Sequence, residues 1–297
     1  MIWILSYPGI SLCYGFLYLS VVLLWYPGKR KTPNWATSLF LALCFGLISG
    51  QLEWSALIPI VLFAVAAFYS QAKKTDPDQR FIATVGVLFL SLGLISHQLP
   101  GFNALMVLDH VYFTTDALPY NLYLNIDKAL VGIFILGFGP ALLSNRKQAL
   151  LLAKKIWQPI LIFILLMMIL AFILNFIRFE PKLSSNILIW VLTNLLLTCV
   201  AEEALFRGFI QKKLTQQFKL QKVKGGAAAA LIIASVLFGL AHYSGGKKYV
   251  FLAMMAGLGY GWLYQQTKRI EASIAMHFGL NLVHFIFFTY PALASVY

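Results

Sequence analysis

The sequence predicts an all-α fold, a polytopic bundle of transmembrane helices. The chain is 60% hydrophobic and only 11% charged, whereas soluble domains carry about 25% charged residues. Its mean hydropathy is +0.80. The apolar residues lie in long runs with short polar breaks between them, which is the pattern of helices that cross a bilayer.

Ten apolar runs end at charged breaks or at breaks rich in proline and glycine. Each is a candidate span, and they cover residues 2–26, 35–52, 55–71, 81–99, 129–143, 156–177, 187–209, 227–243, 249–266 and 272–290. Several are shorter than the roughly 20 residues that cross a bilayer comfortably. We therefore expect about 8–10 spans, with eight crossings as the alternative to ten.

The charge distribution indicates which partners the chain has. The net charge is +13, and the lysines and arginines gather in short clusters between the apolar runs. Clusters of this kind are typical of the cytoplasmic loops of membrane proteins, and they argue against nucleic acid as a partner. We expect an integral multi-pass protein of the cell (inner) membrane, with the lipid bilayer as one partner.

The segment 100–127 contains no lysine or arginine but several aromatic residues. We expect a polar loop that caps the bundle at the membrane interface, where aromatic side chains are favoured. His110, with Asp109 and Asp116, is an alternative metal site within this loop.

Polar residues divide the chain into two parts. Residues 1–183 carry charges almost only in the breaks, whereas from residue 184 onward ionisable residues lie inside the apolar runs. We therefore predict N-terminal transmembrane helices of unknown role over 1–183 and a functional core over 184–297. Within the core, Gly257 and Gly261 have the four-residue spacing that lets membrane helices pack closely.

The first polar cluster of the core is formed by Glu202, Glu203 and Arg207. A charge at the centre of a membrane helix costs about 2.5–3.5 kcal/mol, so we expect these residues to be used. Glu203 and Arg207 are four residues apart and can form an ion pair on a helix. Glu202 points about 100° away from Glu203 and is left to face a cavity. The alternative is an ordinary charged helix end.

Two further clusters contain histidine. His242 lies four residues after Phe238, and His277 lies four residues before Asn281, so each pair shares one helix face. His284 lies seven residues after His277, close to the helix face that His277 and Asn281 share. It either extends the site or only ends this polar stripe.

Together the three clusters suit the hydrolysis of an amide by water. A glutamate can take a proton from water, and an imidazole can hold that water or protonate the leaving amine. A histidine and an asparagine one turn apart can donate to an oxyanion, which is worth about 2.7–4 kcal/mol per donor. The same groups could instead bind zinc, although a His-Glu-x-x-His helix is absent from the sequence.

These residues occur as three ordered motifs. Glu-Glu-x-x-x-Arg begins at Glu202, Phe-x-x-x-His ends at His242, and His-x-x-x-Asn runs from His277 to Asn281. In this the chain resembles the CPBP family of intramembrane proteases, the CAAX proteases and bacteriocin-processing proteins that are also called Abi proteins. The resemblance covers about the last third of the chain.

The resemblance implies a membrane endopeptidase that cuts a peptide or protein, near the C-terminus of a CAAX-type or sorting-tail substrate or within a short peptide. Glu202 becomes the base that activates water, assisted by His242, and His277 and Asn281 become the oxyanion donors. Glu203 and Arg207 become supporting residues. This glutamate mechanism requires no cofactor, and a divalent metal such as zinc is the alternative.

Two other functions stay open at this point. One is a non-catalytic immunity or scaffolding protein of the same fold. The other is a proton- or ion-coupled transporter, in which Glu202 and Glu203 line the path of the ion.

The motifs also constrain the topology. Glu202 lies late in one predicted helix and His242 late in the next, so simple crossings would put them near opposite membrane faces. We therefore expect that the chain re-enters the membrane after Arg207 or that one span is short.

Overall fold

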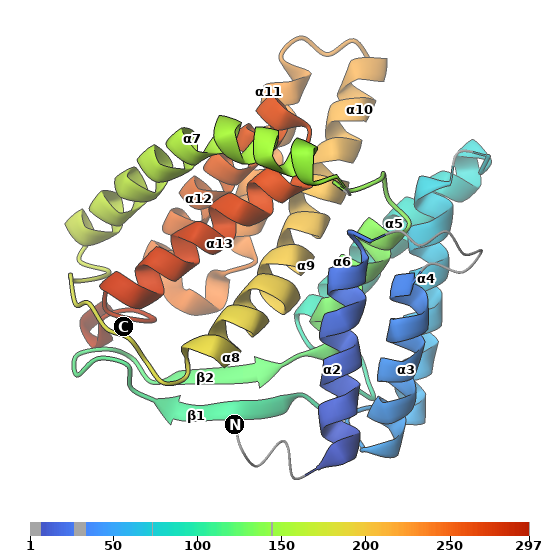
Figure 1. The fold of residues 1–297 in the computed structure, drawn as a ribbon. Coiled ribbons are helices and arrows are strands. Elements are labelled where there is room, and N and C mark those ends of the chain that lie inside the picture. Colours follow the sequence, from blue (N-terminus) through green and yellow to red (C-terminus); the bar gives the residue numbers. More distant parts are fainter. Residues whose placement is uncertain (1–6, 27–33, 73, 144, 297) are drawn as a thin grey trace. The chain divides into compact units, whose positions relative to one another are not determined.

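The computed structural model describes residues 7–26, 34–72, 74–143 and 145–296 (Figure 1). Over these ranges the chain is mainly helical, with one two-stranded sheet. The predicted all-α class is confirmed. The chain forms two compact units, and the first comprises the described residues of Met1–Val107, Tyr123–Ser144 and Leu196–Leu205.

The first unit is built around one short buried helix. Its elements are α2 (Pro8–Leu23), α3 (Asn34–Ile48), η1 (Trp54–Ala56), α4 (Leu57–Gln71), α5 (Pro77–Ile95), α6 (Ile126–Gly137) and α9 (Val200–Glu203). Helix α6 packs against α2, α4, α5 and α9, and Lys128 is the one residue between Ile126 and Leu136 that is not fully buried. Hydrophobic burial on all sides explains why this 12-residue helix is stable.

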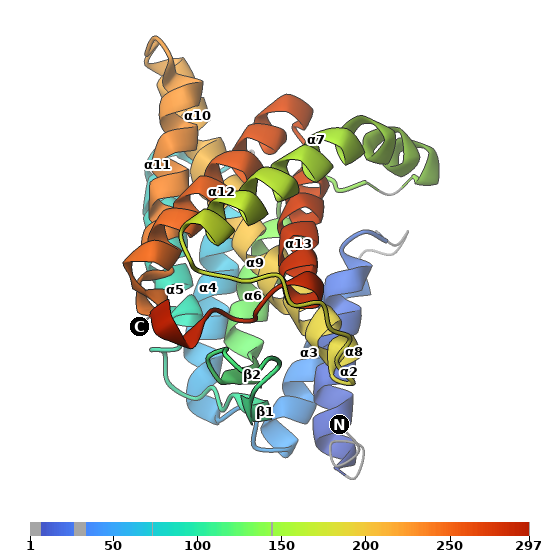
Figure 2. The same cartoon turned by 90° about the vertical axis from the view of Figure 1, so that its left-hand side faces the viewer.

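The second unit comprises Leu108–Leu122, Asn145–Leu195 and Phe206–Tyr297. Its elements are α7 (Arg146–Ile173), α8 (Ile187–Leu192), α10 (Lys212–Leu220), α11 (Gly226–Leu240), η4 (Tyr243–Gly245), α12 (Gly246–Thr267), α13 (Ile270–Phe287) and η5 (Ala294–Val296). Helix α12 packs against α7, α11 and α13. Helices α10 and α11 lie side by side as a hairpin (Figures 1 and 2).

Helix ends follow local chemistry rather than hydropathy alone. Helix α5 begins where the Asp76 side chain accepts a hydrogen bond from the backbone N–H of Asp78, with Pro77 in the first turn. Helix α7 begins ten residues before the expected position 156, because the Asn145 side chain accepts from the N–H of Lys147. Capping thus adds a polar first turn that a count of apolar residues leaves out.

The helix Ile187–Leu220 is continuous but irregular. It contains two π-helical segments, η2 (Thr193–Cys199) and η3 (Ala204–Gln211), on either side of α9. Wide turns of this type are rare and occur frequently at functional sites. The four residues between the two segments include Glu202 and Glu203.

Among the described residues, five helices are long and apolar enough to cross a membrane. They are Trp54–Gln71, Pro77–Ile95, Arg146–Ile173, Ile187–Leu220 and Ile270–Phe287. The helices Gly226–Leu240 and Tyr243–Thr267, bent by 60° at their junction, make a sixth if they are one broken span.

Five or six candidate spans are fewer than the eight to ten predicted. Helices α2 and α3 are shorter apolar helices, and α6 has only 12 residues. The expected re-entry after Arg207, or the alternative of one short span, stays a prediction, and the bend between Gly226–Leu240 and Tyr243–Thr267 lies next to His242.

The segment expected to be a polar loop forms the sheet instead. It contains β1 (Leu105–Val111) and β2 (Tyr120–Leu124), which pair with each other. Along β2 the buried residues Leu122 and Leu124 alternate with exposed ones, which is the period of a strand. The alternation is visible in the sequence, but five residues are too few to outweigh the surrounding turn residues.

Candidate active site

The two glutamates lie on α9 in the first unit, and both are buried. Oε1 of Glu202 accepts a hydrogen bond from Nζ of Lys128 over 2.7 Å. Because a buried charge is costly unless it is paired, Lys128 stabilises the carboxylate. Lys128 was not among the residues predicted for the site, although it is the only lysine or arginine between residues 81 and 145.

Arg207 lies on η3 and belongs to the second unit, where it is fully buried. Its Nη2 donates to the carbonyl oxygen of Gly257 over 3.0 Å. Its guanidinium carbon lies 4.4 Å from the ring centroid of Phe238 and 5.3 Å from that of Tyr260. A desolvated guanidinium over aromatic faces is attracted by their quadrupoles.

The close approach predicted at Gly257 and Gly261 is confirmed. Gln211, four residues after Arg207, donates from Nε2 to the carbonyl oxygen of Gly261 over 3.0 Å. Two side chains of η3 thus bind two carbonyl groups of α12 with the same four-residue spacing. A Cβ atom at Gly257 would lie 3.1 Å from Nη2 of Arg207 and from Cα of Ser235, so glycine lets the helices approach more closely here than a larger residue would.

The ion pair of Glu203 with Arg207 stays a prediction. Its basis was the four-residue spacing of an α-helix, but Arg207 lies in a π-helical segment. There the hydrogen bonds join residues five apart. The spacing argument therefore holds less strictly here than it would on a regular helix.

The ring of Phe238 is the centre of the histidine cluster in the second unit. His242, four residues later and just beyond the end of α11, has its ring centroid 4.6 Å away. His277 on α13 lies 5.8 Å away and edge-on, and Arg207 covers the ring as described. The structure thus brings both predicted histidines and the predicted supporting arginine onto one aromatic side chain.

The hydrogen bond of His242 fixes its tautomer. Nδ1 lies 2.7 Å from the carbonyl oxygen of Phe238, which can only accept. Nδ1 therefore carries a proton, and in the neutral ring the lone pair is on Nε2. His242 lies in the break between α11 and α12, directly before η4.

His277 and Asn281 are held from two directions. The ring of His277 is buried and stacks on Tyr260, with centroids 4.7 Å apart. Asn281 donates from Nδ2 to Oδ1 of Asn194 over 3.2 Å. Asn194 lies on η2 and was not singled out from the sequence, because a single asparagine in an apolar run carries no motif.

His284 binds the C-terminal segment. Its Nε2 lies 3.0 Å from the carbonyl oxygen of Thr289, and its ring packs on Tyr290. These contacts favour the reading that His284 ends the polar stripe.

His110, Asp109 and Asp116, the alternative metal ligands of the 100–127 segment, form ion pairs in the structure. Asp109 contacts His110, while Asp116 pairs with Arg178 over 3.3 Å. Within the described ranges, we find no group of three or more His, Cys, Asp or Glu side chains that could hold a metal ion.

The region that contains the three motifs matches a protein-family model. Residues 184–283 match the family model described as Type II CAAX prenyl endopeptidase Rce1-like. This range contains all six predicted site residues and confirms the resemblance drawn from the three motifs. No curated protein and no solved structure matches the chain. With its apolar helices, the chain is an integral multi-pass membrane protein that contains a region like this membrane-protease family.

Proposed function

We propose that the protein is an intramembrane endopeptidase in which Glu202 activates water for attack on a peptide bond. One observation carries the proposal: the Rce1-like match contains a buried carboxylate, two histidines on one aromatic ring and an asparagine on the same helix as the second histidine. This set supplies a base, a water-binding group and oxyanion donors.

The proposed reaction assigns one task to each group. Glu202 accepts a proton from water, and the resulting hydroxide attacks the carbonyl carbon of the scissile bond. Nε2 of His242 accepts a hydrogen bond from that water, as its tautomer permits. His277 and Asn281 donate to the oxyanion of the tetrahedral intermediate. The protonated Glu202 then gives its proton to the leaving amine.

The substrate in this proposal is a peptide or protein that is cut near its C-terminus, as in CAAX-type or sorting-tail processing. The location is the cell (inner) membrane, and the reaction requires no cofactor. Zinc bound by imidazole and carboxylate groups is the competing mechanism.

The test is a cleavage assay of the purified protein in lipid vesicles, with prenylated CAAX-type peptides and sorting-tail peptides analysed by mass spectrometry. Glu202→Gln keeps the shape of the side chain but removes the base, so cleavage should fall by at least about 100-fold. The exposed Glu53 provides the matched control Glu53→Gln, which should cleave like the parent.

Three results would contradict parts of the proposal. Cleavage that is undiminished in Glu202→Gln would exclude the role of the base. Loss of cleavage with a chelator and its recovery with zinc would establish the metal mechanism. Proton or ion uptake that depends on Glu202, with no peptide cut, would establish a transporter.

A further inference from the structure

We infer that Lys128 is a positioning residue for Glu202, which extends the site to a helix outside the family match. The inference rests on the proposed function, because it concerns the same carboxylate. Lys128 lies on α6, whereas the match covers residues 184–283. It gives part of the N-terminal region, whose role the motifs leave open, a task in catalysis.

The contact is short and shielded from solvent. Nζ of Lys128 lies 2.7 Å from Oε1 of Glu202, and the two side chains are 17% and 8% exposed. An ion pair at this distance and burial is not screened by solvent as a surface pair is. The ammonium group compensates the negative charge of Glu202 and restricts the rotation of its carboxylate.

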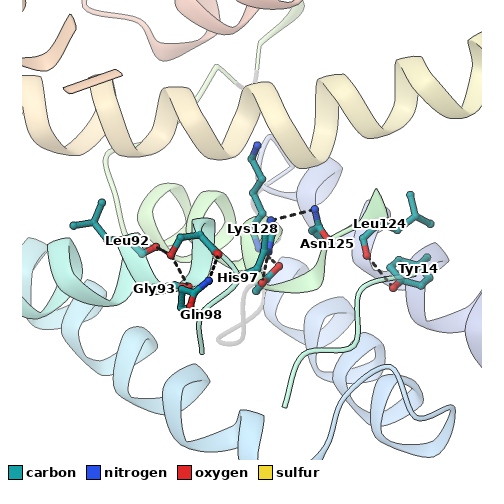
Figure 3. Close-up of polar contacts among 10 residues, drawn as sticks. Tyr14, Leu92, Gly93, His97, Gln98, Leu124, Asn125 and Lys128 are labelled. Carbon is teal, nitrogen blue, oxygen red and sulfur yellow. Dashed lines mark hydrogen bonds and ion pairs between the residues drawn. The ribbon is translucent and has the colours of Figure 1, made fainter. Parts of the chain in front are cut away.

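The backbone of Lys128 is fixed by its neighbours. The N–H of Lys128 donates to Oδ1 of Asp127 over 2.7 Å, and Oδ2 of the same carboxylate lies 2.6 Å from Nδ1 of His97. Asn125 contacts the other ring nitrogen of His97, and Figure 3 shows His97, Asn125 and Lys128 close together. Both oxygens of Asp127 are thus used to fix the turn that presents Lys128.

The helix that carries Lys128 lies tightly against the helix that carries Glu202. A Cβ atom at Gly132, one turn after Lys128, would lie 3.1 Å from Cα of Ala201 and 3.2 Å from its backbone nitrogen. Backbone atoms cannot move aside as a side chain can. Gly132 therefore permits the close approach of α6 and α9 that lets Lys128 reach Glu202.

This arrangement has a consequence for catalysis. A general base works only if its oxygen is within hydrogen-bond reach of the water that it deprotonates, and a misplacement of about 1 Å can cost about 100-fold in rate. A glutamate side chain has several staggered rotamers. Lys128 selects one of them by binding Oε1.

The experiment compares Lys128→Met with Lys128→Arg in the vesicle cleavage assay. Methionine keeps the unbranched apolar stem but removes the charge, so kcat should fall about 100-fold. KM should stay near the parent value, because Lys128 acts through Glu202 and not on the substrate. Arginine keeps the charge and should restore most of the lost kcat. Lys147→Met, at an exposed position of α7, is the control.

A second measurement tests the ion pair without activity. Thermal unfolding of Lys128→Met should occur at a lower temperature than that of the parent, because the buried carboxylate of Glu202 loses the ammonium group that binds its Oε1. The double variant Lys128→Met/Glu202→Gln should recover part of that loss. A double variant whose loss equals the sum of the two single losses would show that the side chains are not coupled and would overturn the inference.

The two proposals fail in different ways. If Glu202→Gln is inactive while Lys128→Met has the parent kcat, the positioning role is excluded and the proposed function stands. If Glu202→Gln still cleaves, the proposed function is excluded, and the catalytic role of Lys128 with it.

Discussion

The imidazole of His277 lies nearly flat on the phenol ring of Tyr260, with centroids 4.7 Å apart and planes inclined by 15°. The guanidinium of Arg207 lies 5.3 Å from the same ring. Tyr260 thus orients a predicted oxyanion donor and a buried cation at the same time. The backbone beside it is fixed as well, since the hydroxyl of Ser273 donates to the carbonyl oxygen of Tyr260 over 3.0 Å.

This contact predicts a ring-dependent effect on activity. Tyr260→Phe keeps the stacking surface and should keep most of the cleavage activity. Tyr260→Leu removes the ring, lets His277 rotate and should lower kcat by about 10-fold or more. The exposed Trp262 on the same helix gives the control Trp262→Leu. Equal kcat values for Tyr260→Phe and Tyr260→Leu would show that the stacking does not orient His277.

The planar guanidinium of Arg207 makes contacts that a lysine cannot reproduce, so we expect the variant Arg207→Lys to be less stable than the parent. Arg207→Lys keeps the positive charge, but an ammonium cannot both cover the Phe238 ring and reach the Gly257 carbonyl as the planar fork does. A desolvated cation–π contact is worth about 2 kcal/mol, so the free energy of unfolding should fall by at least about that amount.

Chemical denaturation in detergent micelles measures the effect of Arg207→Lys. Arg146→Lys, at an exposed position in the first turn of α7, is the control and should leave the unfolding midpoint unchanged. If Arg207→Lys unfolds at the same denaturant concentration as the parent, the positive charge alone, and not the stacked geometry of the guanidinium, matters at this site.

The close contact at Gly257 predicts opposite results for two glycine substitutions. Gly257→Ala places a methyl group 3.1 Å from Nη2 of Arg207 and from Cα of Ser235, and overpacking of this kind costs about 1–3 kcal/mol. Gly15 lies inside α2 with no atom within 4 Å of its added Cβ. Gly15→Ala should therefore be neutral or stabilise by up to about 1 kcal/mol. The unfolding temperatures of both variants are measured against that of the parent. A lower unfolding temperature for Gly15→Ala, with an unchanged one for Gly257→Ala, would contradict the prediction.

Much of the helical framework could be predicted because its signal is local. The apolar runs 35–52 and 272–290 became α3 and α13 with shifts of a few residues at their ends. The pairing of His242 with Phe238 was also predictable, because four-residue spacing on a helix requires no knowledge of the rest of the fold.

The features that were missed depend on distant parts of the chain. Lys128 and Glu202 are 74 residues apart in sequence, and Asn281 and Asn194 are 87 apart. No periodicity links such pairs, so only the packing of helices reveals them. The π-helical segments on either side of Glu202 were also missed, since turns of this type are rare and the sequence reading was based on regular α-helical spacing.

The buried cluster of Tyr120, Tyr290 and Trp190 predicts that the protein loses stability at alkaline pH. Burial raises the pKa of Tyr290 well above its usual value of 10.0, and burial also raises the pKa of Tyr120, whose ring lies 5.2 Å away. A phenol with a raised pKa keeps its proton in the folded protein but ionises in the unfolded chain above pH 10. The contribution of these phenols to the free energy of unfolding is therefore fully present below pH 10. It decreases as the pH rises from 10 toward the raised pKa of the folded protein.

Unfolding of the parent and of Tyr290→Phe at increasing pH measures this effect. Above pH 10 each buried phenol should cost up to about 1.4 kcal/mol per pH unit, so the variant should lose stability less steeply than the parent. At neutral pH the variant should be less stable by about 1 kcal/mol, because Nε1 of Trp190 loses the Tyr290 hydroxyl to which it donates over 3.1 Å. The exposed Tyr112 gives the control Tyr112→Phe. Parallel stability curves for the parent and Tyr290→Phe above pH 10 would show that Tyr290 is not the titrating group.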